Sequence, residues 1–185
     1  MRPKLFLLSA FLMLGSVSAQ VFNTAHVLPP GKVSLGINPI MLNNSGVNDF
    51  VLFLHGGYGL KPGLDLGARL GVGYEGSNNY WGLDLEWVLN SARPLFSVTT
   101  GIHALEDIGL DLTGNLTFPM NRTAHVYCGI DSDINFSDPV RMPVWLFAGA
   151  DVIVERNMAL LFELNFGVTE PATNIFSFGL TFYFR

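Results

Sequence analysis

Several acidic residues and one histidine have the types and spacing that acid–base chemistry requires. His103 lies between two segments that carry Asp84 and Asp111, and a histidine beside carboxylates can act as a general base. Asp131 and Asp133 add two carboxylates, whose oxygens also suit a calcium ion. No segment has the spacing of an EF-hand loop. We therefore expect these residues to form a hydrated acidic surface, with no catalytic residue, no metal and no cofactor.

Arg69 is the one strongly basic residue that the sequence places in the middle of the same surface. Glu86 and Asp84 follow on the next predicted strand at a similar height. A buried guanidinium needs a carboxylate partner, so we expect an ion pair of Arg69 with Glu86 and Asp84. Such a pair could gate a channel, but in a narrow interior we expect it to act as a structural plug.

These residues lie on segments in which apolar and polar side chains alternate with a period of two, which indicates β-strands. The last segment is the clearest, because Phe176, Phe178, Phe182 and Phe184 alternate with mostly small or polar residues. The same test predicts ten strands, at 32–41, 50–60, 64–74, 81–89, 95–104, 108–118, 124–135, 144–154, 158–168 and 175–184.

Short and long connections largely alternate between the predicted strands, as they do in transmembrane β-barrels. An even number of strands places both chain ends on the same side of such a barrel. Tight turns are predicted at 61–63, 90–94, 119–122 and 156–157, and longer polar loops at 42–49, 76–80, 137–142 and 169–174.

Volume decides which face of the strands points inward. The apolar face offers about five large side chains per strand, and the interior of a ten-stranded barrel cannot hold them. The face rich in glycine, serine, threonine and aspartate fits inside, so the apolar face meets lipid, where unpaired backbone groups force the sheet to close. Aromatic residues at strand ends, such as Tyr80 and Trp81, suit the membrane interfaces. The predicted fold is an all-β, closed, antiparallel, up-and-down transmembrane barrel of about ten strands, eight being possible.

The pattern of the first residues indicates an export signal. A basic start precedes an apolar run at 5–14, and small residues end at Ala19, which is typical of a cleaved signal peptide. We expect residues 1–19 to be removed and 20–185 to form the barrel. Only 14% of the residues are charged, whereas 49% are hydrophobic, which disfavours an ordinary soluble domain. A net charge of −5 disfavours nucleic acid as a partner, and a single cysteine, Cys128, excludes an internal disulfide.

The export signal, the ten alternating segments and the final strand NIFSFGLTFYF resemble the small outer-membrane β-barrel proteins of Gram-negative bacteria. The resemblance covers the whole predicted mature chain. It implies insertion into the cell outer membrane, with lipid as a partner, and recognition of a terminal phenylalanine by the barrel assembly machinery. Phe184 would supply that signal on a terminal assembly strand with Phe176, Phe178 and Phe182. Arg185 follows it, which departs from the usual ending.

The sequence favours a structural barrel or a narrow porin-like pore that prefers cations and passes ions or small solutes. Eight carboxylates are predicted inside, against Lys32 and Arg69. Two alternatives remain open: a hydrolase at the barrel rim built on His103, and a surface binding or adhesion protein acting through 42–49 and 137–142. The rim hydrolase would resemble the omptin proteases, but the chain matches no omptin motif. The predicted inner carboxylates are Asp65, Asp84, Glu86, Asp111, Asp131, Asp133, Asp151 and Glu163.

Overall fold

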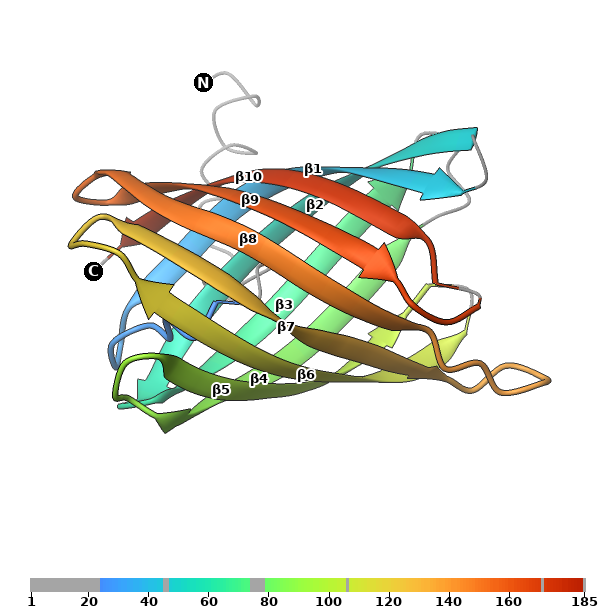
Figure 1. Ribbon diagram of the computed structural model, residues 1–185, viewed down its shortest axis with the longest axis horizontal. Coiled ribbons are helices and arrows are strands. Elements are labelled where there is room, and N and C mark those ends of the chain that lie inside the picture. Colours follow the sequence, from blue (N-terminus) through green and yellow to red (C-terminus); the bar gives the residue numbers. More distant parts are fainter. Residues whose placement is uncertain (1–23, 45–46, 74–78, 106, 171, 185) are drawn as a thin grey trace, which may run out of the picture.

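The computed structural model describes residues 24–44, 47–73, 79–105, 107–170 and 172–184, and these form one closed barrel of ten antiparallel strands (Figure 1). Each strand pairs with its neighbours in sequence, and β1 pairs with β10. The predicted fold class is therefore confirmed. The strands are β1 (Val33–Asn44), β2 (Val47–Lys61), β3 (Leu64–Gly73), β4 (Tyr80–Asn90), β5 (Leu95–Ala104), β6 (Ile108–Pro119), β7 (Ala124–Asn135), β8 (Val144–Glu155), β9 (Met158–Gly167) and β10 (Asn174–Phe184).

The barrel closes through the ladder between its first and last strands. Val33 lies opposite Phe184 at one end of this ladder, and Asn43 lies opposite Asn174 at the other. Closure leaves no strand edge unpaired, which is what a sheet surrounded by hydrocarbon requires. In the part of the chain that the structure describes, no helix is long and apolar enough to cross a membrane. The predicted signal peptide at 1–19 and the final Arg185 lie outside the described residues.

The alternation of the sequence becomes an apolar outer surface and a mainly polar interior. On β3, Leu70 and Val72 expose 58% and 60% of their surface, whereas Asp65 on the opposite face exposes 2%. Ser97 and Thr117 are fully buried inside the barrel. The outer face therefore carries the large apolar side chains, as the volume argument predicts.

The predicted loop at 42–49 is wrong, because both flanking strands continue through it. Leu42 lies opposite Asp49, Asn43 opposite Asn48, and Asn44 opposite Val47. Only residues 45–46 separate β1 from β2. The prediction ended the strand where asparagine and aspartate interrupt the apolar alternation. The backbone hydrogen bonds of the ladder do not require apolar side chains, so the pairing continues. This region is a hairpin, which removes one of the two loops expected to bind a partner.

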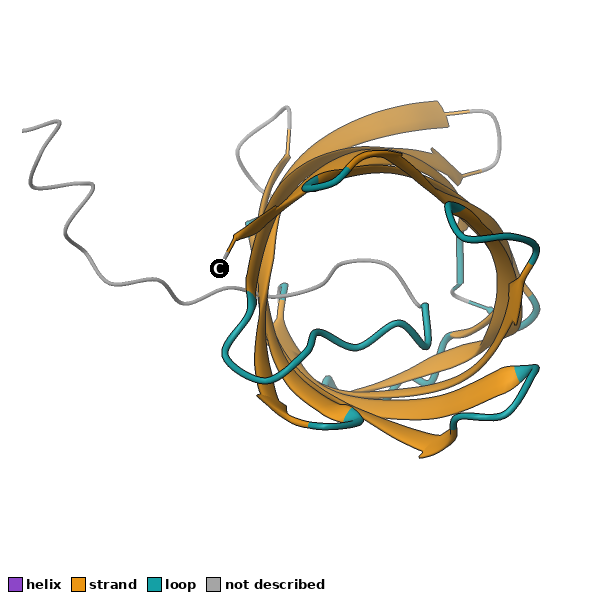
Figure 2. Ribbon diagram, turned by 90° about the vertical axis from the view of Figure 1, so that its left-hand side faces the viewer, coloured by secondary structure: helices purple, strands orange, loops and turns teal. Residues whose placement is uncertain are grey.

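The two ends of the barrel differ in their connections. At one end, called the turn end here, short turns join β2 to β3, β4 to β5, β6 to β7 and β8 to β9. The C-terminal strand also finishes at this end. At the other end, called the loop end, the connection between β7 and β8 is the longest, at 136–143. Figure 2 looks into the barrel from the turn end.

Candidate functional site

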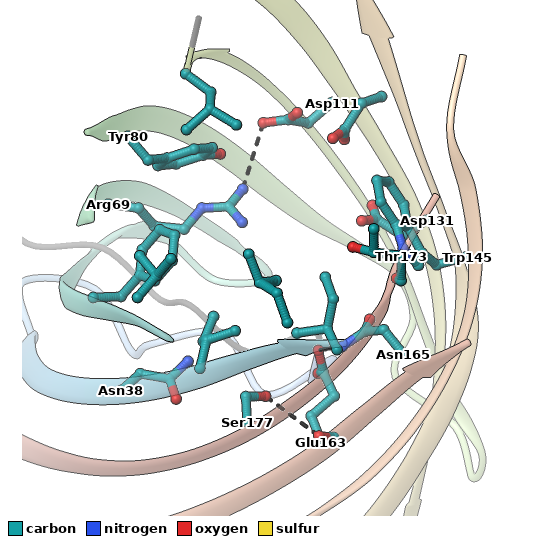
Figure 3. A pocket seen from close by; sticks show the side chains of 17 residues that line it. Asn38, Arg69, Tyr80, Asp111, Asp131, Trp145, Glu163, Asn165, Thr173 and Ser177 are labelled. Carbon is teal, nitrogen blue, oxygen red and sulfur yellow. Dashed lines mark hydrogen bonds and ion pairs between the residues drawn. The ribbon is translucent and has the colours of Figure 1, made fainter. Parts of the chain in front are cut away.

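Arg69 on β3 occupies the centre of a charged cluster inside the barrel (Figure 3). Its Nε and Nη2 donate to the two carboxylate oxygens of Asp84, at 2.7 and 2.6 Å, which is a bidentate ion pair. Nη2 also lies 3.5 Å from Oδ2 of Asp111. The ring of Tyr80 covers the guanidinium, with its centroid 5.8 Å from Cζ. One cation is thus held by two carboxylates and one aromatic face.

The predicted pairing of Arg69 with Glu86 does not form among the ion pairs of the described residues. The strand register explains this. Arg69 lies opposite Gly82, so Asp84 is two residues along β4 but Glu86 is four, which is about 13 Å along the strand. Glu86 lies instead opposite Asp65, nearer the turn end. Of the two expected carboxylates, Asp84 lies in contact with Arg69, and Asp111 is a second partner that the sequence did not indicate.

His103 on β5 contacts Asp111 but not Asp84. Its Nδ1 faces Oδ1 of Asp111, and its Nε2 lies 2.8 Å from the amide oxygen of Asn135. The imidazole also stacks on Tyr80, with ring centroids 5.7 Å apart. His103 is only 2% exposed. The sequence therefore identified the histidine and one carboxylate correctly, and missed Asn135, which lies opposite Gly109 where β7 ends.

Ligand atoms of His103, Asp111 and Asp133 lie within 4.8 Å of one another, the spacing of a metal site. The imidazole does not fit that role as it stands, because both ring nitrogens face oxygen atoms. A ring nitrogen that donates a hydrogen bond has no lone pair left for a metal. The cluster is better described as a hydrogen-bonded network that includes Arg69.

Tyr80 was expected at a membrane interface, but it points into the barrel. Tyr80 shares its strand face with Gly82 and Asp84, two residues apart each time, and this parity indicates the inner face. The aromatic belt at strand ends is a weaker signal than strand parity. The correction matters because Tyr80 contacts both Arg69 and His103.

A cavity of about 480 Å³ opens within the loop-end half of the barrel. One side is lined by Asp111, Asp131 and Asp133 from β6 and β7, which we call the acidic wall. Asp131 accepts a hydrogen bond of 2.5 Å from Thr113, and Asp133 lies opposite Asp111. Asp111, Asp131 and Asp133 therefore line one side of the cavity together, and His103 contacts Asp111.

The side across from the acidic wall is lined by Asn38 and Ser177 and by a group of apolar side chains, which we call the apolar wall. It consists of Ile40, Val51, Phe53 and Ile175 from β1, β2 and β10. In the closed strand order, β1 and β2 lie across the barrel from β6 and β7. The cavity is thus amphipathic from side to side.

The interior also holds large apolar side chains among its mostly small or polar residues. Tyr127, Phe147 and Leu161 from β7, β8 and β9 expose 2–3% of their surface. Gly149 makes room for one of them, since a Cβ at Gly149 would overlap the Tyr127 ring. The space at Gly149 is therefore filled by an aromatic ring. On β8 both strand faces are partly apolar, so alternation could not separate them.

Residues 24–32, called the N-terminal plug here, fold back into the turn end of the barrel. In Figure 2 this segment lies across part of the ring of strands. The backbone N–H of Ala25 donates to Thr117 Oγ1 at 2.9 Å, and that of Leu28 donates to Asp65 Oδ2 at 3.0 Å. Both plug residues are at most 5% exposed. The interior side chains thus satisfy backbone donors that would otherwise be buried without partners.

The N-terminal plug also contacts the barrel through a pair of histidine rings. His26 lies on His125 of β7, with ring centroids 4.0 Å apart, and His125 contacts Asp151 at 3.1 Å. Nε2 of His26 is buried and has no hydrogen-bond partner among the described residues. Burial and the neighbouring His125 lower the pKa of His26 to about 4. The docked plug therefore holds a neutral imidazole at neutral pH.

The N-terminal plug was not predicted from the sequence, although one signal points to it. Pro29-Pro30-Gly31-Lys32 has proline and glycine at the central positions that a type II turn requires. Lys32 N donates to Pro29 O at 3.0 Å, and Gly31 has a φ of 74°. This turn reverses the chain just before β1. A segment that reverses at the end of a barrel strand has only the interior or the surrounding solvent in which to lie.

The phenylalanines of the terminal assembly strand lie on the outer face of β10. Phe176, Phe178, Phe182 and Phe184 are 36–45% exposed. Phe178 packs on Phe162 of β9, with ring centroids 5.0 Å apart. These residues form part of the apolar outer surface and do not contact the charged cluster. Recognition of this strand by an assembly machinery stays a prediction.

Comparison with known proteins supports the architecture. No protein-family profile matches the chain, and no curated protein matches it. Among solved structures, the KdgM porin in complex with disordered oligogalacturonate is 12% identical over 82% of this chain and 99% of that chain, with a TM-score of 0.50. The translocator domain of the autotransporter NalP from Neisseria meningitidis is 9% identical over 99% and 94%, with a TM-score of 0.48. These are outer-membrane β-barrel proteins, and at this identity the likeness to the KdgM porin shows the fold alone: this chain is a closed ten-stranded barrel of that architecture.

Proposed function

We propose that the protein is an integral outer-membrane barrel with a narrow, porin-like interior that prefers cations. The observation that carries this proposal is the amphipathic loop-end cavity, whose ionisable side chains are mostly carboxylates. Arg69 balances part of this charge through Asp84 and Asp111. Asp131 and Asp133 keep the cavity acidic. A low-dielectric wall around such a cavity focuses the field and raises the local concentration of cations.

Membrane insertion is supported by the outer surface. Leu70, Leu112 and Trp87 each expose 55–58% of their surface on strands whose other face is buried. Exposed apolar side chains gathered on one face of a closed sheet mark a lipid contact. In this arrangement the turn end faces the periplasm, and the loop end faces the exterior.

Insertion is tested by comparing an arginine on the outer face of a strand with an arginine on an exposed loop. Leu112→Arg should destabilise the barrel in liposomes by about 2–4 kcal/mol, the cost of arginine near the bilayer midplane. The control is an arginine at the exposed loop residue Asp138, which should cost much less. Urea unfolding in lipid vesicles measures both. An equal cost at the two positions would contradict insertion through this surface.

Two constrictions keep the pore narrow. Arg69 and its two carboxylates cross the middle of the interior, and the N-terminal plug lies across the turn end. The porin with a similar fold was solved with an acidic oligosaccharide, oligogalacturonate. An interior with this many carboxylates would repel such a polyanion. The chemistry of this chain therefore favours a different solute from that of the KdgM porin.

The measurement that tests the pore is single-channel current across a planar bilayer with unequal KCl on the two sides. We expect a small conductance and a reversal potential whose sign shows that K⁺ crosses more readily than Cl⁻. Asp131→Asn combined with Asp133→Asn should move the reversal potential toward zero, while Asp138→Asn on the exposed loop should leave it unchanged. Anion preference in the unmodified protein would overturn the proposed selectivity, and no current even from a plug-deleted chain would overturn the pore.

We propose no hydrolase at the rim. His103 has both ring nitrogens engaged, by Asp111 and Asn135, and the described contacts of its ring include no hydroxyl nucleophile. The cluster therefore lacks the hydrogen-bonded nucleophile and base that covalent hydrolysis needs. Of the two loops expected to bind a partner, the one at 42–49 is a β-hairpin in the structure. The binding or adhesion alternative therefore depends on the loop between β7 and β8.

A further inference from the structure

We propose that the loop-end cavity is a binding site for a small organic cation, one with an amine or quaternary ammonium group on an apolar body. The proposal rests on the proposed function of the acidic interior and names the class of solute that it takes. Three observations carry it: the carboxyl groups of the acidic wall, the apolar wall across from it, and an indole placed beside the carboxyl groups.

The acidic wall holds more carboxyl groups than it has basic neighbours, since Asp111, Asp131 and Asp133 lie beside Arg69 and His103 alone among the described ion pairs and clusters. Arg69 is bound by Asp84 and Asp111, so its charge is already used. The ion pairs of the described residues include neither Asp131 nor Asp133. Asp131 has a hydroxyl donor, Thr113, but a hydroxyl carries no positive charge. Two carboxyl groups two residues apart on β7 therefore face the cavity without an arginine or lysine partner among the described residues, and His103 is the basic neighbour of Asp133. Asp131 in particular is available to a cation.

The apolar wall selects the kind of cation. A hydrated metal ion would gain nothing from Ile40, Val51, Phe53 and Ile175, which line the cavity across from β6 and β7. An organic cation can bury an apolar body against these residues while its charge stays at the carboxylates. A volume of about 480 Å³ also suits a small molecule and far exceeds a single ion.

Trp145 places an aromatic face beside the charged end of the cavity. It lies opposite Asp131 in the ladder between β7 and β8, and its indole Nε1 donates to Thr173 O at 2.7 Å. The indole is 9% exposed, so this hydrogen bond fixes the ring inside the barrel. Figure 3 shows Trp145 and Asp131 on the same side of the cavity, away from Arg69. Tryptophan is the best ring for a cation, and the adjacent carboxylate strengthens the attraction.

A divalent metal is the competing occupant, and the side chains fit it less well. The group with metal-like spacing is His103, Asp111 and Asp133, but the histidine nitrogens are hydrogen-bonded to oxygen atoms. Asp111 is also within 3.5 Å of the Arg69 guanidinium, which opposes a second positive charge at that carboxylate. Asp131 lies outside this group and opposite Trp145, where a cation–π contact is available.

Isothermal titration of the refolded barrel in detergent micelles tests the site, with benzyltrimethylammonium chloride as the probe. Benzyl alcohol is the uncharged control, calcium chloride tests the metal, and titration into empty micelles corrects for partition. We expect saturable binding of the cation at one site and none of the alcohol. Asp131→Asn with Asp133→Asn should weaken binding about tenfold or more, because the charge partners are lost. Trp145→Leu should weaken it about three- to tenfold, through the lost ring face.

Asp138→Asn on the exposed loop is the matched control, and it should bind like the unmodified protein. Circular dichroism and resistance to detergent unfolding must show that each variant is folded. Unchanged affinity in the folded double variant overturns the proposal, and so does saturable binding of calcium without binding of the organic cation. A barrel that conducts cations but binds no benzyltrimethylammonium refutes this site alone. A barrel that binds the probe but passes no current refutes the pore and leaves this site standing.

Discussion

The two ends of the barrel are built from the same ten strands, but the interior side chains contact different partners at each end. At the turn end, Thr117 and Asp65 are bonded to backbone N–H groups of the N-terminal plug. At the loop end, Asp131 and Asp133 face a cavity of about 480 Å³ without an arginine or lysine partner among the described residues. Aspartate therefore has two roles in one interior. Where the chain itself supplies donors, the carboxylate stabilises the fold, and where it does not, the carboxylate is available to a solute.

The difference shows what strand alternation does and does not determine. Alternation decides whether a side chain points inward, because its period matches the pleat. It carries no information on which inward positions meet another part of the same chain. Asp65 and Asp131 are indistinguishable by parity, and the plug separates their roles.

Removing the N-terminal plug should have the largest effect. Deletion of residues 24–30 should raise single-channel conductance several-fold, since the segment lies across the turn end of the interior. The measurement is planar-bilayer current at fixed KCl, with resistance to detergent unfolding as the control for an intact barrel. Unchanged conductance would mean that the plug is not a constriction, and the two ends would not differ as described.

Arg69→Ala should have the next largest effect, because it removes the central constriction. The variant leaves Asp84 and Asp111 without their cation, so conductance should rise and the preference for cations should sharpen. Current and reversal potential under asymmetric KCl report both changes. A variant that conducts no better, or that selects anions, shows that Arg69 does not restrict the path.

Gly59→Val should loosen the plug without deleting it. A Cβ at Gly59 would overlap the carbonyl oxygen of Pro29, a backbone atom that cannot rotate away. The plug also binds here through Gly31 N to Gly59 O, at 2.8 Å. Conductance should rise less than in the deletion, and protease cleavage near the N-terminus should become faster. Gly114→Val is a control, because a Cβ there makes only ordinary contact with Ile130.

Acidification should give the smallest effect, confined to the turn end. The pKa of docked His26 is about 4, whereas an undocked histidine has its ordinary pKa of 6.5. The undocked plug therefore binds more protons, so docking is fully favoured above pH 6.5 and weakens as the pH falls toward 4. His125 and Asp151 face the same position. Comparing conductance of the unmodified protein and His26→Phe between pH 7 and pH 4.5 isolates the contribution of His26. Identical pH profiles would exclude it.

Much of the fold could be predicted because period-two alternation is a local signal. The segments at 95–104 and 124–135 begin and end as predicted, since clear turn residues bound them. Asp84 could be assigned to Arg69 because neighbouring strands in a meander pair with a register that the turn sets. Glu86 could not be excluded from sequence, because a difference of two residues in register moves a side chain by about 7 Å.

The rest of the site depends on contacts between distant parts of the chain. Asn135 reaches His103 from a strand two positions away, and Trp145 lines the cavity from a strand on which both faces are partly apolar. The plug binds residues on β3, β6 and β7, which no local pattern encodes. Only the Pro29-Pro30-Gly31 turn hinted that the chain reverses there. The residue types could be read from the sequence, but the contacts between residues far apart in the chain could not be predicted from it.

The N-terminal plug also bears on the order in which the barrel assembles. The seam between β1 and β10 joins Val33 to Phe184, so its closure carries the loop-closure entropy of nearly the whole chain. The plug directly precedes β1 and binds Asp65 on β3 and Thr117 on β6, which are far closer in sequence than β10. Once docked, it tethers β1 to a sheet that is already forming and raises the effective concentration of its free edge. A segment that narrows the finished pore would then also act as an intramolecular guide for the last strand to pair.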